Sequence, residues 1–556
     1  MLIDLKGVIL FFEINEMEIA MTIIKIETKP FENQKPGTGG LRKQTKVFLE
    51  PNYLENFVQA SITVRKNLGD RVESWVVGGD GRYPGKLVLG KIVKILVANG
   101  VKKIFVVGRD LVAPTPAISN VIRKYKADGG FILSASHNPG GINGDFGVKV
   151  EMANGGGAPE IITNAIYEET KIISEYLTLD ISDEDALEMA EVEYLNPIKD
   201  YADLMEGLFD FEAIRGWFNA GHTFRFDAMN ASTGPVAIEI FVNRLGAKKE
   251  WILNSEPMPD FGGVHPEPNP TYAKNLFDMM MDGIADFGCA CDGDGDRNMI
   301  LGNKFYVIPS DCLAIMTKYH KLIPYYKNGL SGVARSIPTS SSVDRVAKKM
   351  GIDVYNTPTG WKFFASLLDA GKINLCGEES FGQGGDYIRE KDGIFAILFW
   401  LNILAKTNKT VEELVREMWN ENGRIFYSQY SYEGVDKEKA TKIWEDMKTV
   451  NIDGVMYGKF QIAKKEVFDY TDPVNNEIAK AQGVQILTTD GVRIFFRLSG
   501  TGTVGATMRL YIEKYEEDSS KFSLSAREYL KDVYLLVDEI LEIRKVFGDI
   551  KPSAIN

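Results

Sequence analysis

Cysteine and histidine are scarce in this chain of 556 residues. The four cysteines are Cys289, Cys291, Cys312 and Cys376, and there are only four histidines. So few cysteines in so long a chain exclude a disulfide framework and indicate a reducing compartment. The one-residue spacing of Cys289 and Cys291 suits neither a redox nor a zinc motif, and so few histidines argue against a catalytic zinc centre.

The chain also lacks an excess of positive charge and a long apolar run near its start. Its net charge is −13, with 77 acidic and 64 basic residues, so we expect neither a nucleic-acid nor an anionic-membrane partner. The apolar run at 7–12 is short and flanked by Asp4 and Glu13, so we expect no signal peptide and no membrane anchor. We therefore expect a cytoplasmic protein. The charge does not exclude small phosphorylated ligands, and we take a monomer or weak homodimer as the expected state.

What is present is the composition of a large globular protein, with 44% hydrophobic and 25% charged residues. One hydrophobic core stops growing at about 250–300 residues, so several domains are expected. Runs at 73–80, 102–109 and 129–136 predict buried strands, and 87–100 and 116–130 predict helices. Similar strand–helix patterns recur at 224–247, with a Gly-Pro turn before the helix, and between 330 and 382.

The tail has a different pattern. Residues 492–500 and 506–515 predict two strands around a glycine-rich loop, followed by a charged helix at 524–547. We therefore predict an α/β fold with residues 1–20 as an extension. Three related α/β domains would span 21–205, 206–322 and 323–420, and an α+β domain would span 421–556.

The first loop that contains candidate catalytic residues is SASHNPGG at 134–141. It follows an apolar strand, and ligands bind at the carboxyl ends of strands in open α/β sheets. The Pro-Gly-Gly turn is expected to expose the hydroxyl of Ser136. A serine hydrolase is disfavoured because G-x-S-x-G is missing and adjacent Ser136 and His137 do not easily adopt triad geometry. A serine that carries a phosphoryl group fits better; a polar turn with a capping serine is the alternative.

The second loop, DGDGDR at 292–297, places Asp292, Asp294 and Asp296 at alternate positions. Three carboxylates in a tight loop can converge on one hard cation, and oxygen ligands favour Mg²⁺ over zinc. An EF-hand is excluded because Arg297 stands at its sixth position and Asn303 at its twelfth. A solvated acidic loop is the less favoured alternative.

The third loop, RLSGTGTVG at 497–505, contains G-x-G-x-x-G. A dinucleotide fingerprint must open a helix, whereas the residues that follow here predict a strand, so we reject NAD. Backbone amides, the hydroxyls of Ser499 and Thr501, and the side chains of Arg497 and Arg509 predict a phosphate cradle. A glycine-rich hairpin without a ligand stays open as an alternative.

The fourth loop, CGEESFG at 376–382, sets carboxylates beside a hydroxyl at the end of a strand. Glu378 and Ser380 there suit hydrogen bonds to a sugar, although a helix N-cap is the plainer alternative. Lys391 lies close by in the sequence and could contact a phosphate.

These four loops, in this order, resemble the α-D-phosphohexomutase superfamily, of the phosphoglucomutase and parafusin type. The resemblance covers nearly the whole chain from about Met21. Further matching segments are PGTGGLRKQ (36–44), NGDFGVK (143–149), FGGVHPEPNP (261–270), ARSIPTS (334–340) and TPTGWKFF (357–364). Two positions depart from the family pattern: Ser134 stands where Thr is usual, and Gly39 stands where Ser is commoner.

The resemblance implies three related α/β domains and a smaller α+β domain around a central cleft. It implies interconversion of α-D-glucose 1-phosphate and glucose 6-phosphate, with Mg²⁺ and with glucose 1,6-bisphosphate as the activating intermediate. Ser136 would carry the phosphoryl group and would hold Mg²⁺ together with Asp292, Asp294 and Asp296. The other implied site residues are Arg42, His137 and Lys149 at the transfer site, Glu378 and Ser380 on the sugar, Arg497, Ser499, Gly500, Thr501 and Arg509 on the distant phosphate, and Thr359, Gly360, Lys391 and Arg297 elsewhere around the substrate.

Lys149 is a candidate for proton transfer. Two alternatives remain at this point. One is a mutase of mannose or pentose phosphates. The other is a parafusin-like or cytoskeletal phosphoprotein with a scaffold or exocytosis role, in which we would expect the serine or the aspartates to be eroded.

Overall fold

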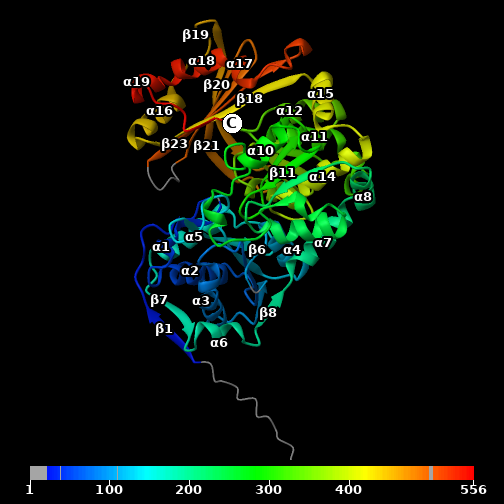
Figure 1. Cartoon of the computed structure of the whole chain (residues 1–556). Coiled ribbons are helices and arrows are strands. Elements are labelled where there is room, and N and C mark those ends of the chain that lie inside the picture. Colours follow the sequence, from blue (N-terminus) through cyan, green and yellow to red (C-terminus); the bar gives the residue numbers. More distant parts are fainter. Residues whose placement is uncertain (1–21, 38, 109, 500–504, 556) are drawn as a thin grey trace, which may run out of the picture.

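The computed structural model describes residues 22–37, 39–108, 110–499 and 505–555. The predicted extension at 1–20 therefore lies outside the described residues. Within those ranges, no helix combines the length and the apolar character needed to cross a membrane. We number the four predicted domains 1–4 in chain order. Figure 1 shows domain 1 (blue) at one end of the molecule and domain 4 (orange and red) at the other, with domains 2 and 3 between them.

Three sheets share one strand order, which makes domains 1–3 topologically related. In each, the second strand pairs in parallel with the first, the first with the third, and the third pairs with an antiparallel fourth. The repeated strands are β3 (Ser74–Gly79), β4 (Lys103–Val107), β5 (Gly129–Leu133) and β6 (Asp145–Met152) in domain 1; β9 (Phe224–Asp227), β10 (Ile252–Leu253), β11 (Phe287–Cys291) and β12 (Asn298–Gly302) in domain 2; and β14 (Val333–Ser336), β15 (Val354–Thr357), β16 (Leu375–Glu378) and β17 (Gly382–Gly385) in domain 3.

Further strands extend this repeated unit. In domain 1, β2 (Leu41–Gln44) and β8 (Val192–Leu195) flank the sheet, and β1 (Ile23–Glu27) pairs with β7 (Glu175–Leu179); in domain 2, β13 (Phe305–Val307) pairs with β12. The helices of domain 1 are α1 (Thr45–Phe48), α2 (Tyr53–Asn67), α3 (Gly85–Ala98), α4 (Thr115–Lys124), α5 (Glu160–Thr170) and α6 (Asp183–Leu187). The next helices are α7 (Pro197–Leu208), α8 (Phe211–Asn219), α9 (Thr233–Ala237), a π-helix (Ile238–Arg244) and α10 (Lys274–Met281), followed by α11 (Pro309–Tyr319), α12 (Ser342–Met350), α13 (Lys362–Asp369), α14 (Gly393–Thr407) and α15 (Val411–Asn422). We count α7, which spans the predicted boundary at 205, with domain 2. We count α11, which precedes the predicted boundary at 322 but packs on α12 and β16, with domain 3.

One core joins domains 2 and 3. The sequence of α14 is apolar on every side, as expected for a fully buried helix, and it packs against α8, β11 and β12 of domain 2 as well as β17 of domain 3. Its N-terminus is capped by buried Asp392, whose carboxylate accepts from the backbone N–H of Phe395. Domains 1 and 4 have hydrophobic clusters of their own. The two middle domains therefore form one block, whereas each outer domain has a separate core.

Domain 4 is built on a seven-stranded antiparallel sheet in the order β19-β20-β21-β22-β23-β18-β24. Its strands are β18 (Arg424–Val435), β19 (Met456–Tyr457), β20 (Phe460–Thr471), β21 (Ile478–Thr488), β22 (Val492–Ser499), β23 (Ala506–Glu516) and β24 (Ala554–Ile555), and its helices are α16 (Lys437–Thr449), α17 (Ala526–Tyr529), α18 (Lys531–Leu541) and α19 (Ile543–Phe547). The pairing of β22 with β23 confirms the two strands predicted around the glycine-rich loop.

Two local predictions are wrong. The single helix expected at 524–547 is three helices, because Glu542 adopts a left-handed conformation with φ 53° between α18 and α19 and Leu530 interrupts the segment between α17 and α18. Gly234 and Pro235 form no turn; they lie inside α9. Proline is tolerated there because the backbone N–H groups in the first turn of a helix have no acceptor within the helix, so the missing N–H breaks no helical hydrogen bond.

Candidate active site

Each of the repeated domains presents the same loop, which joins its third strand to the antiparallel fourth. In domain 1 this loop contains Ser136, in domain 2 it spans 292–297 with the three aspartates, and in domain 3 it spans 379–381 directly after Glu378. Three of the four motifs found in the sequence therefore occupy equivalent positions of one repeated fold.

Ser136 is buried, with 1% of its surface exposed, which contradicts the expectation that its turn exposes the hydroxyl. Its φ of 55° is the left-handed region, which is strained for a residue with a Cβ. The Oγ donates to Asp292 Oδ2 at 3.0 Å and lies 3.3 Å from His137 Nδ1. The serine loop therefore lies directly against the aspartate loop of the next domain.

Arg82, which sequence reasoning did not single out, holds this strained turn in place. Its side chain is buried and pairs with buried Asp80, with 2.8 Å between Nε and Oδ2. Its two terminal nitrogens donate to the backbone oxygens of Ser136, Asn138 and Asp145. A planar fork of donors suits several converging carbonyls better than a single ammonium would. No local pattern at 79–86 distinguishes this arginine from a surface one.

Ser136 Oγ and His137 Nδ1 lie 3.3 Å apart, although adjacent serine and histidine side chains were not expected to come together easily. The ring of His137 stacks on that of His265, with centroids 5.7 Å apart, and burial, reinforced by nearby Arg297 and Arg42, lowers its pKa well below the usual range. Among the described residues no carboxylate hydrogen-bonds to His137. The third member of a hydrolase triad is thus missing there, and the imidazole is neutral.

The three aspartates lie close enough to bind one cation. One carboxylate oxygen from each aspartate lies within 4.8 Å of those from the other two, and all three side chains are buried. Asp294 Oδ1 and Asp296 Oδ1 are buried without a hydrogen-bond partner, which is costly unless something else binds them. An all-oxygen set with unsatisfied acceptors fits a hard divalent cation.

The glycines of this loop allow its close packing. A Cβ at Gly293 would lie 2.5 Å from the backbone oxygen of Ser136, and one at Gly295 would lie 2.5 Å from Thr233. Gly295 also has a φ of 72°. The D-G-D-G-D pattern is therefore required both by the turn and by contact with the serine loop.

Lys149 provides a cation next to the carboxylates. Its Nζ lies 2.7 Å from Asp294 Oδ2 and 3.7 Å from Asp296 Oδ2. Burial opposes the charge of Lys149, yet Asp294 and Asp296 hold its pKa above the usual value. Burial likewise opposes ionisation of Asp294, but Lys149 brings that pKa below the usual range. At Asp292, burial together with Asp296 and Asp294 outweighs the opposing effect of Arg297 and raises the pKa well above the usual range.

Two arginines keep donors free at the same place. Arg42 Nε and Arg297 Nε are buried without hydrogen-bond partners, and burial lowers the pKa of Arg42. Arg297 Nε also lies 3.8 Å from Asp292 Oδ2, and Arg297 Nη1 pairs with Glu267 Oε1 at 3.2 Å. Free guanidinium donors beside an oxygen-rich cation site suit a bound phosphoryl group.

The loop of domain 3 faces this cluster. Glu378 accepts from the backbone N–H of Gly360 at 3.0 Å and from Ser380 Oγ at 3.3 Å. Lys391 Nζ lies 3.9 Å from both Glu378 Oε2 and Asp296 Oδ1, and Thr359 Oγ1 is buried without a partner. The helix-cap alternative for Ser380 is wrong, because the residue lies between two antiparallel strands.

In domain 4, Arg497 and Arg509 are cross-strand partners at the end of the β22–β23 hairpin. Arg509 Nε is buried without a partner. Ser499 ends β22, and the predicted contributions of Gly500 and Thr501 lie outside the described residues. Two adjacent arginine side chains on one face of a hairpin form a positive site, as a phosphate cradle requires.

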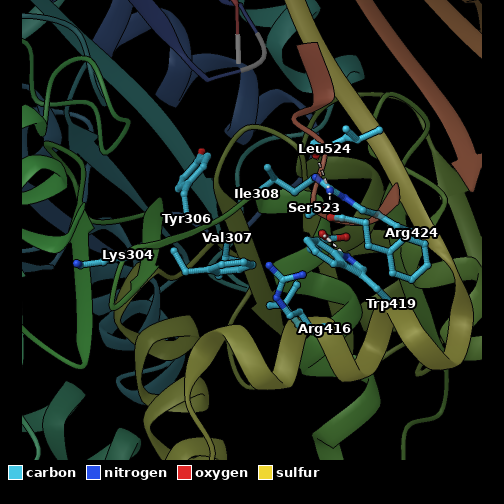
Figure 2. A pocket seen from close by; sticks show the side chains of 13 residues that line it. Lys304, Tyr306, Val307, Ile308, Arg416, Trp419, Arg424, Ser523 and Leu524 are labelled. Carbon is cyan, nitrogen blue, oxygen red and sulfur yellow. Dashed lines mark hydrogen bonds between the residues drawn. The ribbon is translucent and has the colours of Figure 1, made fainter. Parts of the chain in front are cut away.

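A separate cavity of about 190 Å³ marks the junction with domain 4. Figure 2 shows Arg416 and Trp419 of α15 near Arg424 of β18 on its wall, and Arg424 donates to the backbone oxygens of Phe522 and Leu524. Gly423 connects α15 to β18 with φ 77° and ψ 160°, a conformation accessible almost only to glycine. The cavity shares no lining residue with the serine site, so we assign it to the inter-domain junction.

Comparisons with known proteins agree with this architecture. Three family models, described as phosphoglucomutase/phosphomannomutase alpha/beta/alpha domains I, II and III, match residues 33–177, 199–304 and 309–422, and the phosphoglucomutase-1 C-terminal domain matches 424–553. The chain is 47% identical to a phosphoglucomutase of Rhizobium radiobacter, with 95% of this chain and 99% of that protein covered. It is 46% identical to one of Schizosaccharomyces pombe, with 95% and 99% covered.

Among solved structures, the open form of the exocytosis-sensitive phosphoprotein pp63/parafusin, a phosphoglucomutase from Paramecium, superimposes with a TM-score of 0.87. It is 43% identical to this chain, with 96% of this chain and 99% of that protein covered.

Proposed function

The chain belongs to the phosphoglucomutase family, and on this premise we propose that it interconverts α-D-glucose 1-phosphate and glucose 6-phosphate through glucose 1,6-bisphosphate. It would be an intramolecular phosphotransferase. The observation that carries the proposal is the contact between the Ser136 hydroxyl and the buried aspartate loop, at 3.0 Å. A nucleophile beside a cation site and free guanidinium donors is the arrangement that phosphoryl transfer needs.

In the proposed reaction Ser136 carries the phosphoryl group. A sugar hydroxyl oxygen forms a bond to phosphorus, the bond from phosphorus to Ser136 Oγ breaks, and the hydroxyl proton leaves to a base. Ser136 Oγ regains a proton from that base once its bond to phosphorus has broken. In the return step Ser136 Oγ forms a bond to the other phosphorus of the bisphosphate, and the bond from that phosphorus to its sugar oxygen breaks. Neutral His137 is suitably placed to take the Ser136 proton, which passes to the released sugar oxygen. Lys149 is held charged by Asp294 and Asp296, so in this state it can donate a proton or stabilise negative charge but cannot accept a proton.

Asp292, Asp294 and Asp296 would hold Mg²⁺, which when bound neutralises charge on a phosphoryl group. Arg42 and Arg297 would direct their free Nε donors at that group. Glu378 and Ser380 would bind the sugar hydroxyls, Thr359 and Gly360 would contact the substrate beside them, and Lys391 would contact a phosphate. The side chains of domain 1 and domain 2 thus position the reacting phosphate, and those of domain 3 orient the ring.

Two transfers at opposite ends of the sugar require the bisphosphate to turn over between them. Arg497 and Arg509, with Ser499, Gly500 and Thr501, would hold whichever phosphate does not react. Since domain 4 has its own core, we expect it to close over the bound sugar phosphate and exclude water. Crystals with and without sugar phosphate in which domain 4 keeps one position and the site stays open to water would contradict this.

A coupled assay tests the proposal. Purified protein receives glucose 1-phosphate, Mg²⁺ and a trace of glucose 1,6-bisphosphate, and glucose-6-phosphate dehydrogenase reports the product. Product formation that needs Mg²⁺ and is lost in Ser136→Ala is the expected result. Folded wild-type protein without activity would refute the proposal, and greater activity on mannose 1-phosphate would reassign the substrate.

A second candidate function has one observation in its favour, the similarity to Paramecium pp63/parafusin. A parafusin-like scaffold or exocytosis role would not require transfer at Ser136, so a membrane or cytoskeletal partner captured equally by wild type and Ser136→Ala would support it. We also propose a cytoplasmic location and a monomeric or weakly dimeric state, which cell fractionation and analytical ultracentrifugation would test.

A further inference from the structure

Glu151, on β6 of domain 1, is a fully buried acid without a hydrogen-bond donor. None of its surface is exposed, and among the described residues no N–H or O–H group donates to either carboxylate oxygen. An ionised carboxylate is costly in such a place. A protonated carboxyl group, in contrast, can itself donate to a second carboxylate, so the position of Glu151 suits an acid that has another acid beside it.

The second acid is Glu390, which comes from domain 3. Glu151 forms an isolated antiparallel bridge with Gly157, and the side chains of directly opposite residues lie on the same side of such a pair. The N–H of Gly157 donates to Glu390 Oε1 at 3.2 Å, and a Cβ on Gly157 would lie 3.6 Å from that oxygen. The carboxylate of Glu390 therefore lies where a side chain at position 157 would be, next to the side chain of Glu151.

Three consecutive glycines allow domain 3 to come this close to domain 1. A Cβ on Gly156 would lie 2.9 Å from the Cβ of Arg389, and one on Gly155 would lie 2.8 Å from Ser119 Oγ. The backbone N–H of Arg389 donates to that same Ser119 Oγ at 3.5 Å. Side chains at 155–157 would separate the two domains at this point, so the glycine run is required by the contact.

The charged groups around the two acids act in both directions. They are two cations and two carboxylates: Lys149, Lys391, Asp294 and Asp296. Burial outweighs the cations and raises the pKa of Glu390 to about 7, and burial together with Glu390 raises the pKa of Glu151 well above its usual range. Two acids that share a site lose their protons as a pair, so one proton stays on the pair after the first has left.

Glu390 is directly connected to a residue of the proposed site. It belongs to residues 389–392, which join β17 to α14 and which we name the junction segment. Arg389 turns away from the two acids and pairs with the aspartate that ends α13, at 2.6 Å. Lys391 turns towards the site, where its Nζ lies 3.9 Å from Glu378 Oε2. The contact of Glu390 with domain 1 therefore fixes the segment that presents Lys391.

We propose that Glu151 and Glu390 share one proton across the boundary between domains 1 and 3, and that this acid pair is a positioning element for Lys391. The inference rests on the proposed function and deepens it, because it identifies what holds a phosphate-binding cation in place. With the proton, the pair is a hydrogen bond between an acid and a carboxylate. Without it, two like charges repel each other in a buried site, and the junction segment moves away from the glycine run together with Lys391.

The test is the pH dependence of kcat/KM for glucose 1-phosphate in wild type, Glu390→Gln and Glu151→Gln, with the coupling enzyme in excess at every pH. We expect kcat/KM of wild type to fall about tenfold for each pH unit once the shared proton is lost. KM should account for most of this fall, because Lys391 contacts a phosphate and not the reacting hydroxyl. In either variant the glutamine amide donates to the other carboxylate without a proton that titrates, so the fall should begin at least about one pH unit higher.

The matched control is Asp227→Asn. Asp227 is also buried, and burial raises its pKa, but its Oδ1 accepts from the backbone N–H of Met229 and from Asn254 Nδ2, each at 2.9 Å. It therefore has donors of its own and no second acid. We expect Asp227→Asn to keep the alkaline fall of wild type.

Infrared spectroscopy of wild type detects the shared proton without a variant and without activity. The C=O band of a protonated carboxyl group should lose intensity over the same pH range in which kcat/KM falls. This measurement decides the question if neither glutamine variant folds, and in a variant that folds the change in the band should be missing.

An alkaline fall that is unchanged in a folded glutamine variant, or an infrared band that does not change where kcat/KM falls, would overturn the inference while wild type remains an active mutase. So would a wild type whose kcat/KM stays constant with rising pH. An inactive wild type would instead refute the proposed function, and the infrared band would still report on the acid pair, so the two failures are distinguishable.

Discussion

Replacing Arg82 by lysine should separate the geometry of Ser136 from the overall stability of domain 1. Lysine keeps the charge opposite Asp80 but offers one ammonium instead of a planar fork. At least two of the three backbone oxygens that Arg82 binds, those of Ser136, Asn138 and Asp145, would then lose their donor. Each buried acceptor left unsatisfied costs about 1–3 kcal/mol, so we expect the free energy of unfolding to fall by about 2–6 kcal/mol.

The effect on catalysis follows from the strained backbone of Ser136. Its φ of 55° is maintained by surrounding contacts, and a shift of about 1 Å in a reacting group can lower the rate about 100-fold. We therefore expect kcat of Arg82→Lys to fall by about that factor in protein that is fully folded. Urea unfolding gives the stability and the coupled assay gives kcat.

Arg65→Lys is the matched control. Arg65 is buried in the same domain, pairs with Asp70 and donates to the backbone oxygen of Asp128, but has no contact with the serine loop. One buried backbone oxygen loses its donor here, so we expect a loss of stability of about 1–3 kcal/mol and an unchanged kcat. An Arg82→Lys protein that is destabilised but has the kcat of wild type would refute the claim that Arg82 holds Ser136 in its reactive position.

Three further predictions concern the cation, a buried acid and the domain junction. Mg²⁺ should raise the thermal unfolding midpoint of wild type but not of Asp296→Asn, because a ligand stabilises the state that binds it; equal shifts in a fluorimetric melt would place the cation elsewhere. Burial and the nearby Glu390 raise the pKa of Glu151, whose carboxylate has no hydrogen-bond partner. Between pH 4.5 and that raised pKa the folded protein keeps a proton that the unfolded chain has lost. The free energy of unfolding should therefore fall by about 1.4 kcal/mol for each pH unit in this window. Glu151→Gln should flatten this dependence in urea midpoints measured against pH, and a slope equal to that of wild type would contradict it. Gly423→Ala places a Cβ 2.2 Å from the Tyr515 ring and should lower the free energy of unfolding by more than about 3 kcal/mol. The control is Gly454→Ala, which has a similar φ but open space around it and should cost only the backbone strain of about 1–3 kcal/mol. Equal losses of stability in urea would contradict the clash.

The repeated domains were predictable because their strands are short, apolar and separated by amphipathic helices. The runs at 73–80, 102–109 and 129–136 each contain the strand that the structure shows there. In domain 4, β20 and β21 were not predicted, because β20 carries four charged residues and β21 is rich in small and polar residues, and neither alternates clearly. The breaks in the segment 524–547 were missed because the apolar pattern continues past Glu542, although the helical backbone conformation is interrupted at that residue.

Within the site, local motifs were sufficient to propose the serine, the aspartates and Glu378, since each lies in one loop with a recognisable spacing. The contacts that hold them were not predictable. Arg82 and Ser136, or Glu379 and Ser336, are distant in the sequence and meet only through the topology. Burial of Ser136 was also missed, because the aspartate loop that covers it belongs to another domain.

The most direct test of the account is whether phosphate is found on Ser136 during turnover. Wild-type protein is incubated with glucose 1,6-bisphosphate, quenched in acid and digested, and the peptide containing Ser136 is analysed by mass spectrometry beside the same peptide of Ser136→Ala. The account predicts one phosphate on Ser136, lost when glucose 1-phosphate or glucose 6-phosphate is added in excess, and none on the variant. A wild-type enzyme that turns over with Ser136 unmodified, or a Ser136→Ala variant that remains active, would contradict it.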